Sequence, residues 1–321
     1  MFRGPSFISE SPAMPVDPLA EVVTLLQPAA RFSKLVEAAG AWRIRRDGTG
    51  EPFYCAVLQG RCRMSVDGQP PLLLQAGDFV LVPALHDLVN SDPAAPAEGP
   101  ATTPVRIGEG RFRAGRQEGP AALRLRIGHC GFGAPDAALL VPLLPRLVLV
   151  RGEPRLATLV QLVDEESRAG RPAREVVLER LLEVLLIEAL RAGGGAAETG
   201  GAASLARGLG DERLAAALRA MHARPGHPWT VAALAGEAAL SRSAFFARFS
   251  RTVGLAPMEY LLAWRMALAR RLLRGRDLGL EQVAERVGYG SASAFSVAFA
   301  RHVGLPPGRW AAGAEQESRA A

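Results

Sequence analysis

The chain has 321 residues, of which 49% are hydrophobic, and this composition is typical of a globular protein large enough for two domains. No apolar stretch reaches the length of a membrane span, and Met1–Pro15 lacks the apolar core of a signal peptide, so we expect a cytoplasmic protein without a membrane partner. The formal net charge is +6, and residues 205–321 carry 16 arginines against 9 acidic side chains, which indicates a phosphate-bearing partner for this part of the chain.

Turn residues divide the N-terminal part into short apolar runs. From Trp42 to Val89 these runs are separated by Gly, Pro or Asp-Gly, and Asp67-Gly68 is a strong signal for a β-hairpin. We therefore expect an antiparallel barrel or sandwich here. The pattern before it predicts short helices at Leu19–Leu26 and Phe32–Ala38.

The next segment changes character twice. Asn90–Ala122 is rich in Pro, Gly and Ala without a sustained period, which predicts a long mobile loop, and strand character returns at Leu123–Cys130. Helical patterns follow at Pro154–Arg168 and Pro172–Arg191, each with proline in its first turn. Apolar residues cover most of the circumference of the second helix, so it must be buried on several sides. Either the N-terminal domain or a homodimer interface buries it.

A domain boundary is predicted at Ala192–Ser204. This segment reads AGGGAAETGGAAS, and its glycines and other small residues predict a flexible linker. A helix at Asp211–His222 opens the part of the chain that carries the excess positive charge.

One segment of this second part occurs twice. Ser241–Pro257 and Ser291–Pro307 both read S-x-S-A-F-x-x-x-F-x-R-x-V-G-L-x-P. In each copy the first serine can cap a helix, two phenylalanines four residues apart share one helix face, and glycine ends the helix. The four phenylalanines are expected in the core: Phe245, Phe249, Phe295 and Phe299.

Each copy follows a short amphipathic segment and a tight turn. The segments are Val231–Ala238 and Leu280–Val287, and the turns are Ala239-Leu240 and Gly288-Tyr289-Gly290. Helix, short turn and capped helix form the helix-turn-helix layout, in which the second helix enters the DNA major groove. A continuous helix is predicted at Pro257–Arg274, and it would hold two recognition helices at a fixed spacing, since adjacent major grooves on one face of DNA lie about 34 Å apart.

The second copy and the residues before it, V-A-E-R-V-G-Y-G-S-A-S-A-F-S-V-A-F-A-R-H-V-G-L-P-P, resemble the signature of the AraC/XylS family of bacterial transcription regulators. The resemblance extends from Asp211 to Trp310, and the N-terminal half resembles the cupin-like sensor domain of one branch of that family. It implies an α+β multidomain fold, with a cupin-like β-barrel and a helical appendage followed by an all-α domain of two helix-turn-helix units joined by a long helix. The expected divisions are a sensor domain at 1–153, a helical dimerisation segment at 154–191, a linker at 192–204, a DNA-binding domain at 205–312 and a disordered tail at 313–321.

The resemblance also assigns DNA contacts by position. The major-groove contacts fall on Arg242, Ser243, Phe246, Ala247, Ala292, Ser293, Ser296 and Val297. Many relatives carry arginine where this chain has Ala247 and Val297, and arginine to guanine is the commonest specific base contact. We favour weakened or A·T-leaning readout through thymine methyl groups, while recognition through serines, phosphates and DNA shape, and loss of specific binding, are the alternatives.

Basic and hydroxyl side chains near these positions are the expected phosphate contacts, and a solvated surface residue is the alternative for each arginine. These residues are Arg242, Arg251, Arg301, Thr230, Arg265, Arg270 and Arg271.

Cupins include metal-dependent enzymes, whose metal needs clustered histidines and a carboxylate. Gly77 to Pro83 resembles the start of the second cupin motif, but Leu85 and Leu88 occupy its next glycine position and its metal-histidine position. No His-x-His pair occurs near Glu51–Ala56, and His86 alone is a poor metal site. We therefore expect no metal, no cofactor and no enzyme activity, and a cupin metalloenzyme with a fused DNA-binding tail is the alternative. The cysteines form no Cys-x-x-Cys pair and are expected as buried thiols: Cys55, Cys62 and Cys130.

Together these patterns predict a DNA-binding transcription regulator whose N-terminal barrel binds a small-molecule effector. The expected partners are double-stranded DNA, a second copy of the chain, the effector and RNA polymerase. A purely oligomeric role is the alternative for the barrel. The candidate effector-lining residues, for which core packing is the alternative, are Trp42, Phe53, Tyr54, Phe79 and His86.

Overall fold

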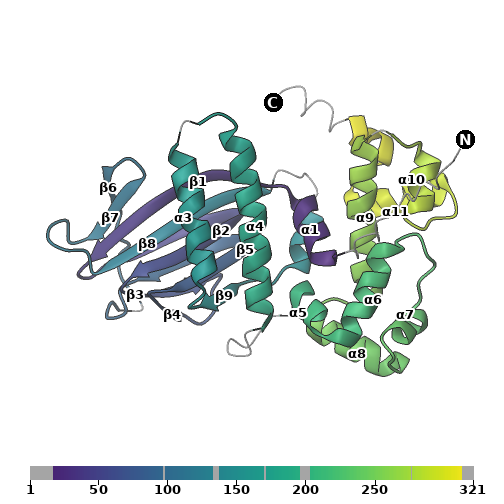
Figure 1. Ribbon diagram of the computed structural model, residues 1–321, viewed down its shortest axis with the longest axis horizontal. Helices are drawn as coiled ribbons and strands as arrows, with labels where there is room; N and C mark the ends of the chain where they lie inside the picture. The colour runs from purple at the N-terminus through teal and green to yellow at the C-terminus, as the bar shows by residue number, and fades with distance from the viewer. Residues whose placement is uncertain are drawn as a thin grey trace, which may run out of the picture.

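The computed structural model describes residues 17–96, 98–132, 137–169, 171–195, 203–275 and 277–312. Most of the predicted linker and the predicted tail at 313–321 lie outside these ranges. Figure 1 shows a sheet domain crossed by two helices and, beside it, an all-helical domain, with a short helix between them. No helix among the described residues is long and apolar enough to cross a membrane.

Among the described residues, nine strands form one sheet in the order β4-β3-β5-β2-β8-β1-β7-β6, with β9 paired to β5. All of the pairs are antiparallel except β1 with β7, which are parallel. The strands are β1 (Pro28–Ala39), β2 (Arg43–Gln59), β3 (Arg61–Val66), β4 (Leu72–Gln75), β5 (Asp78–Ser91), β6 (Val105–Gly108), β7 (Arg111–Gly115), β8 (Leu123–Phe132) and β9 (Val148–Arg151).

The predicted hairpin joins β3 to β4. Asp67 and Gly68 have φ angles of 49° and 68°, the left-handed conformation that a tight hairpin turn with Asp-Gly requires. Arg61 then pairs with Gln75 and Met64 with Leu72, so this prediction is confirmed.

Two predictions for the N-terminal domain are wrong. Phe32–Ala38 lies within β1 and is not a helix, because β1 is held by pairing with β8 on one side and β7 on the other, and neither neighbour is near it in the sequence. Asn90–Ala122 is not a continuous loop, because β5 extends through Ser91 and the segment contains β6 and β7. Tertiary pairing decides both cases over local propensity.

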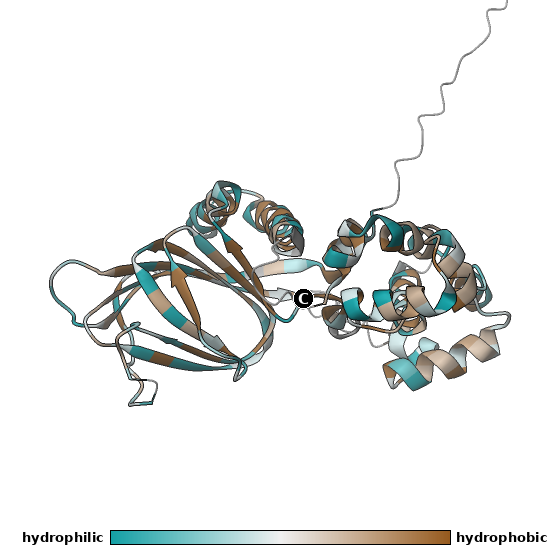
Figure 2. Cartoon of the chain, turned by 90° about the horizontal axis from the view of Figure 1, so that it is seen from below, coloured by the Kyte–Doolittle hydropathy of each residue, from teal (hydrophilic) through white to brown (hydrophobic). Residues whose placement is uncertain are grey.

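The two faces of the sheet belong to different cores. The inner face, seen end-on in Figure 2, packs side chains such as Val36, Phe53 and Ile127 against one another. The outer face carries Tyr54 and Phe79 and is covered by helices. Helices α3 (Pro154–Arg168) and α4 (Arg174–Gly195) lie over this face, while α1 (Pro18–Leu26), α2 (Ala137–Leu140) and η1 (Val141–Leu143) lie beside them towards the helical domain.

The structure shows in part what buries the apolar surface of helix α4, the N-terminal domain or a homodimer interface. Its inner side, which includes Leu182 and Leu186, is buried against the N-terminal domain, whereas Val176, Val177 and Val184 are exposed by 57%, 40% and 39%. The domain therefore buries most of the apolar surface of α4, and one stripe of valines stays on the surface. The helix continues to Gly195, so the first four residues of the predicted linker are helical.

The C-terminal part consists of seven helices within its described residues. They are α5 (Leu205–Gly210), α6 (Glu212–Ala223), α7 (Val231–Glu237), α8 (Arg242–Val253), α9 (Pro257–Gly275), α10 (Leu280–Arg286) and α11 (Ala292–Val303). The core around α6 and α8 is continuous with the core under α1 and α4, while α10 and α11 share a separate core with the C-terminal half of α9. The first unit of the helical domain is thus joined to the sheet domain by apolar packing.

Candidate nucleic-acid interface

Helix α8 buries one side and exposes the other. Ser241 Oγ accepts a hydrogen bond from Ala244 N at 3.3 Å and caps the helix, and Gly254, with φ of 92°, ends it. Phe245 and Phe249 are fully buried. On the opposite side, the assigned DNA-contacting residues Arg242, Ser243, Phe246 and Ala247 are all exposed.

Helix α11 repeats this arrangement. Ser291 Oγ accepts a hydrogen bond from Ala294 N at 3.1 Å, Gly304 has φ of 85°, and Phe295 and Phe299 are fully buried. Ser293 is exposed, and Val297 is 65% exposed, while Ala292 and Ser296 are half-buried. The Ser296 hydroxyl donates to Ala292 O at 2.7 Å, so it is already engaged by its own helix.

The turns that precede α8 and α11 have the same backbone hydrogen bond and the same left-handed residue, and the second turn is one residue longer. Leu240 N donates to Ala235 O at 2.9 Å, and Tyr289 N donates to Ala284 O at 2.8 Å. Ala239 and Gly288, which precede these donors, have φ angles of 50° and 83°. The extra residue of the second turn is therefore Gly290, which lies between the shared turn and the capping serine.

Two of the expected phosphate contacts, Arg265 and Arg270, make contacts within the protein. Arg265 donates to Pro225 O at 2.8 Å and to His227 O at 2.7 Å, so its guanidinium holds the loop between α6 and α7. The same loop lies against the second unit, because a Cβ on Gly226 would meet Glu285 O at 3.0 Å. Arg270 is 8% exposed and lies 5.2 Å from the centre of the Trp310 ring. Sequence spacing placed both on α9 but gave no sign of which side they face.

The remaining phosphate candidates are accessible. Arg242, Arg251, Arg271 and Arg301 are exposed. Thr230 is exposed, and its hydroxyl caps α7 by accepting from Ala233 N at 3.1 Å.

The sequence patterns missed a polar contact between the two domains. Glu21 on α1 approaches His222 on α6, with 2.6 Å between Oε2 and Nδ1. The other ring nitrogen of His222 lies 2.7 Å from Tyr260 Oη on α9, and the ring stacks on Trp264 at 3.9 Å. The side chain of His222 is fully buried. The residues come from segments about 200 positions apart, so only the tertiary structure brings them together.

Acid is expected to weaken this junction. Burial lowers the pKa of His222 below its usual 6.5, although the carboxylates of Glu21 and Asp17 oppose the shift. The unfolded chain then binds more protons than the folded chain in the window below about pH 6.5, so stability falls as the pH falls through that window. We expect the drop in melting temperature between pH 8 and pH 5.5 to be smaller in His222→Gln than in the wild type. The His227→Gln variant, which removes an exposed imidazole, should keep the full drop, and an equal drop in all three proteins would contradict the assignment.

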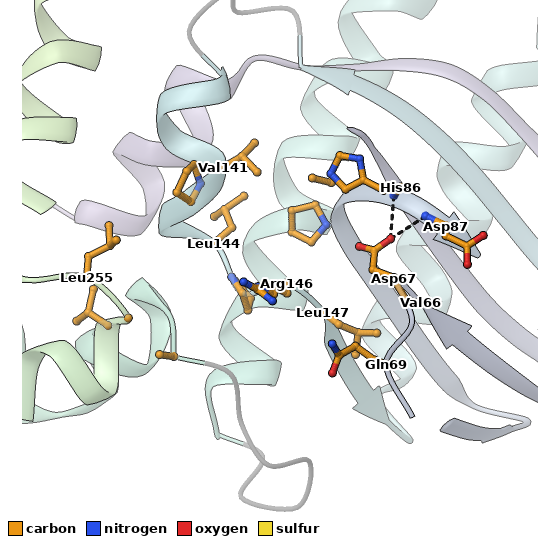
Figure 3. Close-up of a pocket in the computed structure, with 17 residues that line it drawn as sticks. Val66, Asp67, Gln69, His86, Asp87, Val141, Leu144, Arg146, Leu147 and Leu255 are labelled. Atoms are coloured by element: carbon orange, nitrogen blue, oxygen red, sulfur yellow. Dashed lines mark hydrogen bonds between the residues drawn. The ribbon is translucent and has the colours of Figure 1, made fainter. Parts of the chain in front are cut away.

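A pocket of about 840 Å³ lies at the same junction (Figure 3). Its walls come from the end of the sheet domain, from residues 141–147 and from Val253–Leu255 of the helical domain. Asp67 Oδ1 accepts from His86 N at 3.0 Å and Asp87 N at 2.7 Å on one wall, and leucines such as Leu144 and Leu255 form the other. A ligand in this pocket would touch both domains.

The five candidate effector residues do not lie together. Trp42 and Phe53 belong to the inner core of the sheet domain. Tyr54 and Phe79 lie on the outer face, where their rings stack at 6.2 Å beneath the helices. His86 lines the junction pocket. Tyr54 and Phe79 thus pack against helices rather than line a barrel interior.

Within the described ranges, no three or more His, Cys, Asp or Glu side chains are grouped as metal ligands would be. Cys55, Cys62 and Cys130 are buried free thiols, as the sequence predicts. Burial raises the pKa of Cys62 and Cys130 to about 12, so these thiols stay protonated and unreactive at neutral pH.

Comparison with known proteins adds two family matches. Residues 17–193 match a cupin family model, and residues 234–313 match a helix-turn-helix domain model. A putative AraC-like transcription regulator from Streptomyces lividans is 38% identical over 91% of this chain and 97% of its own length. The HTH-type transcriptional regulator AlkR from Acinetobacter baylyi is 37% identical over 44% of this chain and 46% of its own length. Among solved structures, the DNA-binding domain of AdpA in complex with a target DNA is 30% identical, covers 32% of this chain and 93% of its own, and gives a TM-score of 0.31.

Proposed function

Because the chain belongs to the AraC-like family of transcription regulators, we propose that it binds double-stranded DNA through two successive major grooves and regulates transcription from the sites it occupies. One observation carries this proposal. Helices α8 and α11 have the same caps and the same buried phenylalanines, both expose the second serine of the repeat and the residue at 247 or 297, and both are attached to the continuous helix α9.

We assign base contacts to the exposed sides of the two recognition helices. These residues are Arg242, Ser243, Phe246, Ala247, Ala292, Ser293, Ser296 and Val297. The side chains at Phe246, Ala247 and Val297 present carbon to the groove, and carbon contacts the thymine methyl group favourably. None of these three positions carries an arginine, the side chain that best recognises guanine through two hydrogen bonds.

A·T-leaning recognition is the expected outcome of selection from a random DNA library with the purified full chain. The bases facing α8 and α11 should be enriched in thymine and adenine. The Val297→Arg variant should gain a preference for guanine at the base facing residue 297. The binding free energy should favour guanine over the other bases there by about 1–3 kcal/mol more than in the wild type. A motif with only G·C pairs at these bases would refute the assignment.

The exposed arginines supply the expected contacts with DNA phosphates. Each phosphate contact releases counterions, so Arg301→Gln should reduce the slope of log affinity against log salt concentration by about 0.9 and weaken binding to all sequences alike. Fluorescence anisotropy at several salt concentrations measures this slope. Arg106→Gln, in β6 of the sheet domain, should leave it unchanged; an altered slope in that variant would place DNA on the sheet domain as well.

The N-terminal domain is the proposed control element. We assign residues 17–193 to a sensor domain that binds an effector and residues 205–312 to the DNA-binding domain, without a catalytic role for either. The exposed valines of α4, Val176, Val177 and Val184, fit the predicted homodimer interface, because an apolar stripe on a helix is stabilised by covering it. The packed junction between the domains provides a route by which an effector or a dimer contact alters DNA binding. Action in the cytoplasm and contact with RNA polymerase complete the proposal.

A further inference from the structure

Six side chains form a cation–aromatic cluster on the inner face of the sheet domain. They come from strands β1, β2, β7 and β8, which are neighbours in the sheet. Phe53, Val36 of β1 and Ile127 of β8 belong to the inner core. Lys34 lies two residues before Val36, and His129 lies two residues after Ile127. Because side chains alternate along a strand, Lys34 and His129 therefore also face the inner side of the sheet. The members are Phe32, Lys34, Arg46, Phe53, Phe112 and His129.

The cluster is held together at short range. The His129 ring lies 4.5 Å from the Phe32 ring and 5.3 Å from the Phe53 ring. Lys34 Nζ lies 5.7 Å from the centre of the Phe32 ring and 5.4 Å from that of Phe112. Arg46 approaches Phe32 from 5.8 Å. Three basic groups therefore share one aromatic surface, on which Phe32 is 42% exposed.

In the part of the chain that the structure describes, none of the three basic groups has an acidic partner. Among the ion pairs of the described residues, none involves Lys34 or Arg46. His129 is 8% exposed, and its buried Nε2 has no hydrogen-bond partner in the described part of the chain. A buried polar atom without a hydrogen-bond partner lowers the stability of the folded protein, and such atoms are rare in protein cores.

Burial, with a smaller contribution from repulsion within the cluster, lowers the pKa values of two of its basic groups. Burial, together with the charge of Arg46, lowers the pKa of Lys34 to about 8. Burial, Arg46 and Lys34 lower the pKa of His129 to about 4. No carboxylate contributes to either shift. An anion between these groups would satisfy the two cations and accept a hydrogen bond from the His129 ring.

We infer that the cation–aromatic cluster binds a small organic acid, with the carboxylate between Lys34 and Arg46, a hydrogen bond from His129 Nε2, and the apolar body of the ligand on Phe32 and Phe112, while the buried Phe53 supports the His129 ring from within the core. The exposed Phe32 ring and the half-buried Phe112 ring favour an acid with an apolar body over inorganic phosphate, because a bare anion would leave both rings in contact with water. This inference rests on the proposed function in one respect, that the bound acid is the effector of the regulator. The proposed DNA binding does not depend on the acid.

Lys34 makes a direct test possible, because it is the only lysine in the sequence. The full-length protein is treated with an N-hydroxysuccinimide ester, and acylation of Lys34 is measured by peptide mass spectrometry. The α-amino group of the chain serves as the internal reference. Benzoate and hexanoate should slow acylation of Lys34 about tenfold, since a bound carboxylate favours the protonated amine, which is not nucleophilic. Benzamide and hexanamide, which match the acids in shape without the charge, should not.

Each contrary outcome refutes the inference. Equal protection by acids and amides would show an apolar site without charge recognition. Protection by inorganic phosphate as strong as that by benzoate would show a bare anion site. No protection by either acid at millimolar concentration would show that the cluster binds no acid of this kind.

Variants separate this inference from the proposed function. Hexanoate should raise the melting temperature of the wild type and of Arg61→Gln, an exposed arginine of β3 outside the cluster, but not of Lys34→Met or Arg46→Gln. A preserved shift in Lys34→Met would overturn the inference. DNA binding measured without acid should be the same in all four proteins, so its loss in the wild type would count against the proposed function alone.

Discussion

The Phe249→Ala variant is expected to lose about 3–5 kcal/mol of unfolding free energy, because it removes a large apolar side chain and leaves a cavity in a packed core. Phe249 is fully buried, with its ring 5.5 Å from that of Phe245 and 5.8 Å from that of Tyr260. A loss of this size is a large part of the stability of most domains, so DNA binding should also fail at moderate temperature. Denaturant unfolding followed by tryptophan fluorescence measures the change.

The same helix offers the control for this experiment. Phe246 lies three residues before Phe249 on α8, but its side chain is 46% exposed whereas that of Phe249 is buried. Phe246→Ala should therefore cost less than about 1 kcal/mol of stability, as surface substitutions usually do, and should weaken DNA binding while the protein stays folded. Equal destabilisation by the two substitutions would show that the assigned orientation of α8 is wrong.

The Arg265→Met variant is expected to lose about 2–4 kcal/mol of unfolding free energy, because two hydrogen bonds from a charged donor disappear and leave two carbonyl oxygens without it. The guanidinium of Arg265 holds Pro225 O and His227 O, and the loop that carries them contacts α10 of the second unit. The substitution thus loosens the fixed relation between the two helix-turn-helix units.

DNA binding can show this loosening directly. On a DNA fragment with both half-sites, Arg265→Met should bind about 10–100-fold more weakly, because two rigidly spaced contacts benefit from a high effective concentration that a looser pair loses. On a fragment with one half-site the affinity should change little. Arg271→Met, at an exposed position of the same helix, should keep its stability and weaken binding to both fragments alike. An equal loss on both fragments for Arg265→Met would show that Arg265 contacts DNA rather than spacing the units.

Local sequence patterns were sufficient for the helical domain. The two recognition helices, α8 and α11, begin at capping serines and end at glycines, and the i to i+4 phenylalanines mark their buried side without any knowledge of the partner. The contact positions on α8 and α11 came from the family resemblance, and six of the eight are exposed while Ala292 and Ser296 are half-buried. The same local logic located α3, which begins at Pro154, and the hairpin at Asp67-Gly68.

Features that depend on distant partners were missed or misassigned. Phe32–Ala38 has a composition compatible with a helix, but its backbone pairs with β7 and β8, whose positions no local pattern gives. Tyr54 and Phe79 read equally well as lining residues of a barrel, and only the packing of α3 and α4 shows that they face outward. Arg265 and Arg270 match exposed phosphate contacts by spacing alone, yet Arg265 donates hydrogen bonds to the loop between α6 and α7, and Arg270 is buried.

The sequence by itself determined that this protein presents two matched recognition helices, because capping, helix periodicity and the helix stop act over a few residues. Only the tertiary structure decided how the first of these units joins the sensor domain through Glu21 and His222, and which basic side chains meet without an acid at Lys34. Burial, pairing and the balance of charge depend on residues far apart in the chain, and folding alone brings those residues within a few ångströms of one another.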